Sequence, residues 1–507
     1  MKSDMHFATH RIRNFFNFAA SIYELNKKTM RRIFTKAFCF FIFAIAIAGT
    51  ATAQFTISGE FRPRAEYRYG YLKLGDSSIT GYATILGRSR LNFDYNSEKI
   101  QTRFSVQHAF VFGENPYSSD TITKNTVNIY EGWFRYNFTK NFAVRIGRMG
   151  LTYDDMRIFG LSNWKQWGAT HDLVNLEWKV PGANYVGDYG FAINNTAPAS
   201  SYLGDYTLKN YKYMSYLYEQ KKFFKDKLIV SLLGVMDAYQ RYKTTAQPQK
   251  SVKTLVMNNN DTVGSFTTII PATTIVETNK LIIYARGTVG GTVGFNWKNL
   301  SVYANGFYQT GHYKDGRKLS AHFLGGWVSY RVFKSLTLMV GYEQLSGNNV
   351  SDTTELKNTV HGFTTLFGTN HSFYGYMDMY QSYLGQDALH NGLNDLYGRA
   401  TVKFSEKTSL EVTYRWFSLP YGYLPYKATK NTDLPYQSVK TDLGSEVDLM
   451  FLYKPLPNLE LNAAYCLYLK TNTREILDGL KTGKGRLGQY AYLIITYKPN
   501  FFSSERK

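Results

Sequence analysis

The feature that most constrains this chain is a two-residue alternation of apolar and polar side chains, which recurs in about eighteen segments after residue 54. From Leu396 to Phe404 every second residue is apolar or glycine, and the positions between them hold Tyr397, Arg399, Thr401 and Lys403. Because successive side chains of a strand point to opposite faces, each such segment is predicted to be a strand with one apolar and one polar face. A soluble β-protein turns its apolar faces inward, whereas a transmembrane barrel turns them outward to lipid.

The composition favours the barrel. Aromatic residues make up 17% of the chain, with 42 Tyr and 35 Phe, yet the mean hydropathy is only −0.32. No segment after residue 54 is long and apolar enough to form a membrane-spanning helix. Many aromatics in period-two segments are typical of a β-barrel with aromatic girdles at both membrane surfaces. We find no linker and no shift in composition, so we expect residues 54–507 to form one barrel domain.

The N-terminal region has the pattern of a secretory signal peptide. A basic stretch ends at Lys36, residues 37–48 are apolar, and Ala51-Thr52-Ala53 is a small-x-small cleavage site before Gln54. We therefore expect a signal peptide over residues 30–53 that begins at Met30, with residues 1–29 upstream of the true start. Cys466 is then the single cysteine of the secreted chain, so we expect no intrachain disulfide.

The breaks between the alternating segments come in two sizes that take turns along the chain. Eight short breaks fall near residues 97–98, 139–140, 181–183, 222–225, 298–299, 333–334, 405–407 and 454–458. Nine long breaks cover residues 70–81, 113–124, 151–169, 196–208, 241–279, 312–318, 346–394, 418–440 and 471–484. This alternation is typical of an outer-membrane barrel with tight periplasmic turns and long outer loops. The prediction is an all-β, antiparallel transmembrane barrel of about 18 strands, in a range of roughly 16–20, with both termini in the periplasm.

The polar faces of the first five strands are rich in arginine. A charge on the lipid-facing side costs about 2–4 kcal/mol at the middle of the membrane, so these faces are predicted to look into the lumen. The predicted arginine wall consists of Arg62, Arg64, Arg88, Arg90, Arg103, Arg135 and Arg145. Carboxylates gather instead on strands near the C-terminus, in a predicted opposite acidic wall made of Glu411, Glu446, Asp448 and Glu460.

Several motifs resemble the alginate-export family of outer-membrane porins, in the form found in Bacteroidota-type bacteria. They are Gly147-Arg148-Met149 with Tyr153-Asp154-Asp155, Arg157, Gly160, Trp164 and His171-Asp172; residues 367–378 with 391–395; residues 444–449; and residues 497–502. The resemblance spans residues 55–502. It implies a monomeric barrel of 18 strands with an arginine-lined pore that passes an anionic polysaccharide.

Two interpretations of the arginine wall stay open. Guanidinium groups bind carboxylates bidentately and stay charged, so an arginine-lined lumen selects and guides anions. Alternatively, the arginines pair with Glu60, Glu66, Asp94 and Glu131 across the strands and stabilise the wall.

Two long loops are candidates for narrowing the lumen. The third outer loop is predicted to fold inward and narrow the pore, and the alternative is that it is an ordinary outer loop with interfacial tryptophans. The charged and aromatic residues that could form the constriction are Arg148, Asp154, Arg157, Trp164, Trp167, His171 and Asp172. The longest loop, residues 346–394, is rich in aromatics, and the sequence does not decide between a plug, a cap and a rim.

The pattern predicts an outer-membrane porin that passes anionic solutes, including an acidic oligo- or polysaccharide, by passive diffusion. The nine histidines show no metal-ligand spacing, and no Gly-x-Ser-x-Gly elbow is present, so we expect no enzyme activity, metal or cofactor. The expected partners are outer-membrane lipid, lipopolysaccharide, the barrel-assembly machinery and the transported anion, with no nucleic acid. The alternatives are a general diffusion porin with structural arginines, and an outer-membrane adhesin or enzyme that acts through its long loops.

Overall fold

The computed structural model describes residues 53–113, 127–194, 211–247, 250–258, 261–270, 273–380, 391–425 and 436–504. The signal peptide predicted over residues 30–53, Ala53 excepted, and the upstream residues 1–29 lie outside this part of the chain. Residues Phe55–Tyr95 and those from Lys99 onward belong to one compact unit.

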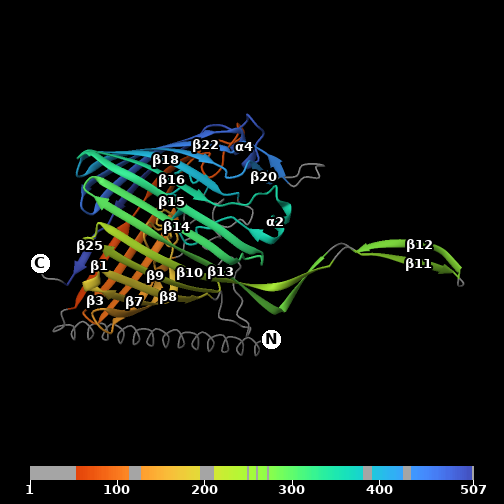
Figure 1. The fold of residues 1–507 in the computed structure, drawn as a ribbon, viewed down its shortest axis with the longest axis horizontal. Coiled ribbons are helices and arrows are strands. Elements are labelled where there is room, and N and C mark those ends of the chain that lie inside the picture. Colours follow the sequence, from red (N-terminus) through yellow and green to blue (C-terminus); the bar gives the residue numbers. More distant parts are fainter. Residues whose placement is uncertain are drawn as a thin grey trace, which may run out of the picture. The chain divides into compact units, whose positions relative to one another are not determined.

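In the described residues, 18 antiparallel strands close into a barrel (Figure 1). The prediction of a barrel with about 18 strands is confirmed. The first strand is interrupted and consists of β1 (Gln54–Phe61) and β2 (Arg64–Tyr69). The strands that follow are β3 (Tyr82–Asn96), β4 (Ile100–Val111), β5 (Asn128–Asn137), β6 (Phe142–Met149), β7 (His171–Val180), β8 (Tyr185–Ile193), β9 (Tyr213–Phe223), β10 (Leu228–Gln247), β13 (Thr273–Trp297), β14 (Leu300–His312), β15 (Lys318–Phe333), β16 (Leu336–Leu345), β18 (Leu393–Ser405), β19 (Thr408–Ser418), β22 (Asp442–Leu456), β23 (Leu459–Lys470), and β24 (Gly488–Tyr497) with its continuation β25 (Asn500–Ser503).

The barrel closes where the last strand pairs with the first. β24 pairs with β2 from Arg64↔Ile494 onward, and β25 pairs with β1 in the register Thr56↔Ser503. Pro63 and Pro499 stand at the breaks in the two strands. Proline has no backbone N–H, so it cannot donate to the ladder, and each strand is interrupted at this point.

Connection lengths follow the predicted alternation. The eight turns between strands such as β13 and β14 are short, and nine long connections alternate with them. The predicted break over residues 241–279 differs, because β10 runs on to Gln247, β13 begins at Thr273, and a hairpin of β11 (Lys250–Asn258) and β12 (Asp261–Ile270) lies between them. Residues 251–279 are rich in Val, Ile and Thr, which favour strands, so the β structure continues through most of this connection.

The predicted inside and outside faces are confirmed on the first strand. The side chains of Phe61 and Tyr67 are 44% and 42% exposed on the outer face, whereas Arg62, Arg64 and Glu66 are buried inside. The hydrophobic core lies within the barrel, where inward-facing strand residues pack against loop residues such as Phe159, Phe363, Met377 and Tyr380, each 0% exposed.

Short elements shape the long loops. The connection after β16 contains α2 (Thr353–Asn358), β17 (Thr359–Val360) and the 3-10 turn η3 (Asn370–Ser372), and the connection after β23 contains α4 (Asn472–Leu477). The Asp352 side chain accepts a hydrogen bond from Glu355 N and so caps α2. The connection after β19 forms a small hairpin of β20 (Tyr423–Pro425) and β21 (Tyr436–Ser438). Figure 1 shows α2, α4 and β20 at the end of the barrel opposite β25. No helix in the described ranges has the length and apolarity needed to cross a membrane.

Candidate functional site: a vestibule beneath two inward loops

The loop of residues 150–170, which joins β6 to β7, crosses the lumen. On one side Asp154 accepts hydrogen bonds from Tyr218 Oη of β9 at 2.9 Å and from Ser231 Oγ of β10 at 2.8 Å. On the other side Arg64 Nη1 of β2 donates to Trp164 O at 2.6 Å, and Arg62 donates to the Asn163 carbonyl. The loop is therefore anchored to two separate parts of the barrel wall, so it folds inward.

Arg157 joins this loop to the loop of residues 346–380. Its guanidinium donates to both carboxylate oxygens of Glu343 on β16, at 2.8 and 2.6 Å, and to Tyr374 Oη at 2.8 Å. The same group lies 3.4 Å from the ring centroid of Phe373. One buried arginine thus binds the wall and both loops. The adjacent Asp155 is half-buried, and desolvation raises the pKa of its carboxyl above the ordinary 3.8, which Arg157 partly opposes.

The two loops also pack directly on each other. Gly160 N donates to Phe367 O, and Thr369 N donates to Met156 O, both at 3.0 Å. The rings of Trp164 and His371 stack with their centroids 3.5 Å apart. These contacts make loop 150–170 and loop 346–380 a single packed body inside the barrel.

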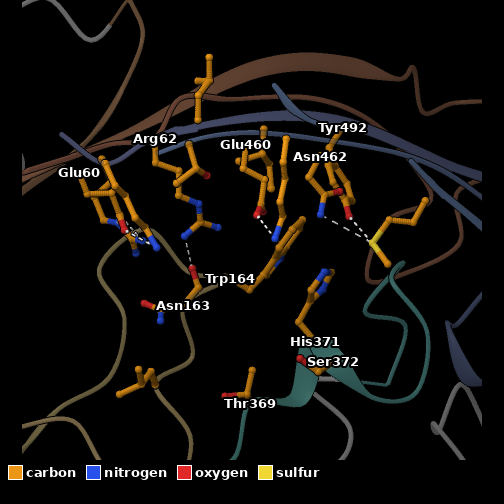
Figure 2. Close-up of a pocket in the computed structure, with 18 of the residues that line it drawn as sticks. Glu60, Arg62, Asn163, Trp164, Thr369, His371, Ser372, Glu460, Asn462 and Tyr492 are labelled. Atoms are coloured by element: carbon orange, nitrogen blue, oxygen red, sulfur yellow. Dashed lines mark hydrogen bonds and ion pairs between the residues drawn. The ribbon is translucent and has the colours of Figure 1, made fainter. Parts of the chain in front are cut away.

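A cavity of about 470 Å³ lies between this body and the barrel wall, and it reaches the short turn at residues 457–458. We call it the vestibule. Figure 2 shows Trp164, His371 and Thr369 from the two loops on one side, and Arg62, Glu460 and Asn462 from the barrel wall on the other. The lining also includes Glu60, Arg88, Tyr376, Lys454, Tyr492 and Lys498.

The lining of the vestibule carries more positive than negative charge. Arg62, Arg88, Lys454 and Lys498 are cationic, and only the carboxylates Glu60 and Glu460 oppose them. Arg88 Nε donates to Glu60 Oε1 at 2.6 Å, while Lys498 Nζ is 3.9 Å from Glu60 Oε2. Lys454 Nζ lies 3.2 Å from Glu460 Oε2. Four cations against two carboxylates leave a formal excess of two positive charges.

His371 and Asp378 form a buried pair at the loop side of the vestibule. His371 Nδ1 lies 2.9 Å from Asp378 Oδ1, and Tyr71 donates its hydroxyl proton to Asp378 Oδ2. Burial and the neighbouring Asp378 raise the pKa of the Tyr71 hydroxyl. The other ring nitrogen of His371, Nε2, has no hydrogen-bond partner within the described residues, although the side chain is only 6% exposed.

Trp164 is part of the vestibule, but its ring is already covered. The Arg64 guanidinium lies 4.0 Å from the ring centroid and the His371 ring 3.5 Å from it. Two groups this close to one centroid cannot share a face, so they occupy opposite faces. Trp164 therefore serves to pack the loop against β2, and it has no open face for stacking on a sugar.

The arginine wall faces inward as predicted, and most of its members are paired. Arg64 binds Glu66 at 2.7 Å, Arg103 binds Asp94 at 2.7 Å, and Arg135 and Arg145 both bind Glu177 of β7, at 2.6 and 2.8 Å. Arg90 donates to the Gln107 side chain and lies over the Tyr130 ring. Among the seven, Arg62 and Arg90 form no ion pair with a carboxylate in the described part of the chain. Most arginines of the wall are therefore neutralised by a carboxylate, and Arg62 and Arg90 are not.

The acidic wall does not face the arginine wall across an open lumen. Glu446 and Asp448 are 0% and 1% exposed, and Glu446 accepts a hydrogen bond from Met377 N of loop 346–380 at 2.8 Å. Glu411 is paired with Arg399 at 3.1 Å. Glu460 alone lines the vestibule.

The structure places the constriction candidates in different surroundings. Asp154, Arg157 and Trp164 lie in the inward loop, and His171 of β7 is buried, with Nδ1 3.0 Å from Tyr211 Oη. Trp167 is 60% exposed, and its carbonyl accepts from Gln107.

The inward placement of Arg148 and Asp172 is wrong. These residues still belong to β6 and β7, where the alternation from Arg145 points them outward. They pair with each other on the outer face at 2.8 Å, with side chains 44% and 52% exposed.

Sequence reasoning missed His371, Lys454, Asn462 and Lys498 as lining residues. The lysines stand where strands meet short turns, and His371 lies in the residue 367–378 motif, so its membership of that motif was the available signal. No group of His, Cys, Asp and Glu among the described residues has the arrangement of a metal site.

Comparison with known proteins agrees with this architecture. The sequence profile of the alginate-export family, described as "Alginate export", matches residues 56–473. The fold is similar to the crystal structure of Acinetobacter baumannii OccAB4, with a TM-score of 0.54 and 11% identity over 89% of this chain and 99% of that chain. Pseudomonas aeruginosa OccK3 (OpdO) gives a TM-score of 0.52 and 11% identity over 88% and 96%, and P. aeruginosa OccD3 (OpdP) gives 0.52 and 10% over 88% and 92%. Comparison with curated protein sequences gave no match.

Proposed function

Because this chain belongs to the alginate-export family and folds as an outer-membrane porin, we propose that it conducts anionic solutes by passive diffusion, with acidic oligo- or polysaccharides as the solute class. The observation that carries this proposal is the excess of positive charge in the vestibule, where four cations meet two carboxylates. Fixed charges in a confined lumen with low-dielectric walls raise the local concentration of counter-ions, which here are anions.

The exposed cations are the ones that act on a passing solute. The Lys454 and Lys498 side chains are 51% and 64% exposed, and Arg103 is 39% exposed. Arg62, Arg64 and Arg88 are less than a tenth exposed and act mainly through the loop carbonyls and carboxylates that they bind. The proposed selectivity therefore depends on the first three residues more than on the buried arginines.

The cellular setting is part of the same proposal. Residues 30–53 direct secretion, the short turns and both termini face the periplasm, and the barrel works as a monomer among lipopolysaccharide after insertion by the barrel-assembly machinery. The alternation of short and long connections supports this orientation.

A general diffusion porin is the second candidate. The ion pairs of Arg64, Arg135 and Arg145 favour it, because their side chains are less exposed than that of Arg103, and an arginine that is neutralised by a neighbouring carboxylate contributes little to the field in the lumen.

Reversal potential in a planar bilayer under a salt gradient separates the two candidates. We expect anion selectivity in the wild type, and a loss of most of it when Lys454, Lys498 and Arg103 are together replaced by Gln. The effect should weaken as the Debye length falls from about 10 Å at 0.1 M salt to about 3 Å at 1 M. The matched control replaces the exposed turn lysines Lys225, Lys298 and Lys334 by Gln, which removes the same charge outside the vestibule. Weak selectivity in the wild type, unchanged in the triple variant, would support the general porin.

A further inference from the structure

The vestibule has the size of a small-molecule site and is too small to be a passage for an extended polymer. Its volume of about 470 Å³ is within the range of roughly 300–1,000 Å³ that is typical of small-molecule sites. The packed loops stand next to it, and the residues that join them are buried: Arg157 is 3% exposed, Phe159 0% and Tyr374 2%. A small ligand fits in the vestibule with the loops in place, whereas a long chain needs the loops to move.

We propose that the vestibule is a saturable binding site for a short carboxylated sugar of one or two residues, in which His371 accepts a hydrogen bond from a sugar hydroxyl. This inference rests on the proposed function for its solute class, and adds to it a site, a ligand size and a residue that distinguishes sugar acids from simple anions.

The geometry of His371 supports its role as an acceptor. Asp378 Oδ1 lies 2.9 Å from Nδ1 and accepts the proton on that nitrogen, so in the neutral ring Nε2 is the acceptor. Nε2 has no partner within the described residues, and the ring is fixed by stacking on Trp164. A buried polar atom without a partner is costly, and a ligand hydroxyl removes that cost.

The opposite wall of the vestibule supplies the complementary groups. Lys454 and Lys498 present exposed ammonium groups that attract a carboxylate. The Asn462 amide and the Tyr492 side chain line the cavity from the strands (Figure 2), and Tyr376 lines it from loop 346–380. A ligand that carries both a carboxylate and hydroxyls matches a lining that contains both cations and a hydrogen-bond acceptor.

The test measures binding by isothermal titration calorimetry on the full-length barrel in detergent, with glucuronate, glucose and acetate as probes. We expect saturable binding of glucuronate with a Kd at least tenfold lower than for glucose or acetate. In a planar bilayer, glucuronate added on the short-turn side should also reduce the ion current with the same concentration dependence.

His371→Phe is the informative variant, because it keeps an aromatic ring against Trp164 and removes both nitrogens. We expect glucuronate binding to weaken by about five- to tenfold, the effect of one lost hydrogen bond. His361→Phe is the matched control, since His361 bonds to Ser320 O and Glu355 away from the vestibule. If His371→Phe does not fold, Lys498→Gln tests the site at the carboxylate of the ligand, and glucuronate binding should weaken. Lys334→Gln, which also removes one exposed lysine, is its control.

The outcomes separate this inference from the proposed function. Acetate binding as tight as glucuronate binding, current that changes linearly without saturation, or unchanged glucuronate affinity in folded His371→Phe would each overturn the binding site. A barrel without anion selectivity that still binds glucuronate saturably would overturn the proposed conduction of anions and support the site.

Discussion

The arginine wall binds backbone carbonyls of one inward loop, whereas the acidic wall binds a backbone N–H of the other. Loop 150–170 turns the carbonyls of Asn163, Trp164 and Gln166 toward Arg62, Arg64 and Arg88. Loop 346–380 instead turns the N–H of Met377 toward Glu446. Each loop therefore presents the backbone dipole that its wall requires, and the two walls need different loops to cover them.

The two walls also differ in how much charge reaches water. Arg103 keeps a side chain that is 39% exposed, whereas Glu446 and Asp448 are 0% and 1% exposed. Charge that is open to the lumen acts on solutes, and charge sealed beneath a loop acts on the loop. Arg103 is therefore placed to act on solutes, and Glu446 and Asp448 hold a loop, while Glu460, with a side chain 40% exposed, is the acidic-wall member that lines the vestibule.

The largest expected effect concerns the residue that joins both loops. Arg157→Ala removes one partner of a buried ion pair and leaves Glu343 uncompensated, so we expect a loss of about 3–5 kcal/mol in the free energy of unfolding. Both loops should lose their anchor, and open-channel conductance should rise. Denaturant unfolding in detergent micelles and bilayer recording measure the two effects.

The control for this change is Arg317→Ala, which breaks the ion pair with Asp315 in the connection between β14 and β15. That pair is more exposed, so a cost of at most about 1 kcal/mol is expected. Equal costs at the two sites would contradict the role of Arg157 as a shared anchor.

A smaller loss is expected on the arginine wall itself. Arg88→Gln removes the bond to Glu60 and weakens the bond to the Gln166 carbonyl at 3.2 Å, for about 1.5–3 kcal/mol. Arg148→Gln, on the outer face, should cost less than about 1 kcal/mol. Chemical denaturation of both variants checks the difference. If Arg88→Gln were as mild as the control, the carbonyls of loop 150–170 would not depend on the wall.

The smallest expected effect is that of Asp448→Asn, which should increase the free energy of unfolding where the other variants lower it. The Asp448 carboxylate is buried next to Cys466, and Glu446 lies two residues away on the same face of β22. Asp448→Asn removes a buried charge, so we expect a gain of about 1 kcal/mol in stability. A shift of the unfolding midpoint to higher denaturant measures it, and a loss comparable to Arg88→Gln would show that the acidic wall needs both of its charges.

Much of the fold followed from the sequence because a barrel strand repeats every two residues and its turns sort by length. The inward direction of Arg62, Arg64 and Arg88 needed only this period and the cost of a charge in lipid. The same period places Arg148 and Asp172 outside once β6 is extended to Met149 and β7 is started at His171. Their predicted inward position came from grouping them with the third outer loop, although the predicted break covers only residues 151–169 and leaves both residues on the flanking strands.

The vestibule could not be predicted from the sequence, for a different reason. Its lining combines Arg62, Trp164, His371 and Lys498, which come together only when two non-periodic loops pack inside a closed barrel. Hydrogen bonds such as that from Gly160 N to Phe367 O join loop segments that no local pattern relates. The aromatic composition of the longest loop left a plug, a cap and a rim open, and tertiary packing decides between them.

The seam between the last strand and the first has a consequence for how the molecule is made. Tyr490 donates to Glu66 across 424 residues of chain, so the final contacts cannot form until the C-terminal strand has been delivered. A chain whose ends must meet has a large loop-closure entropy to overcome, and its contacts are mostly non-local, which slows folding. During synthesis and export the polypeptide therefore spends its whole passage with unpaired strand edges, and protection from aggregation must come from outside the chain until the barrel closes.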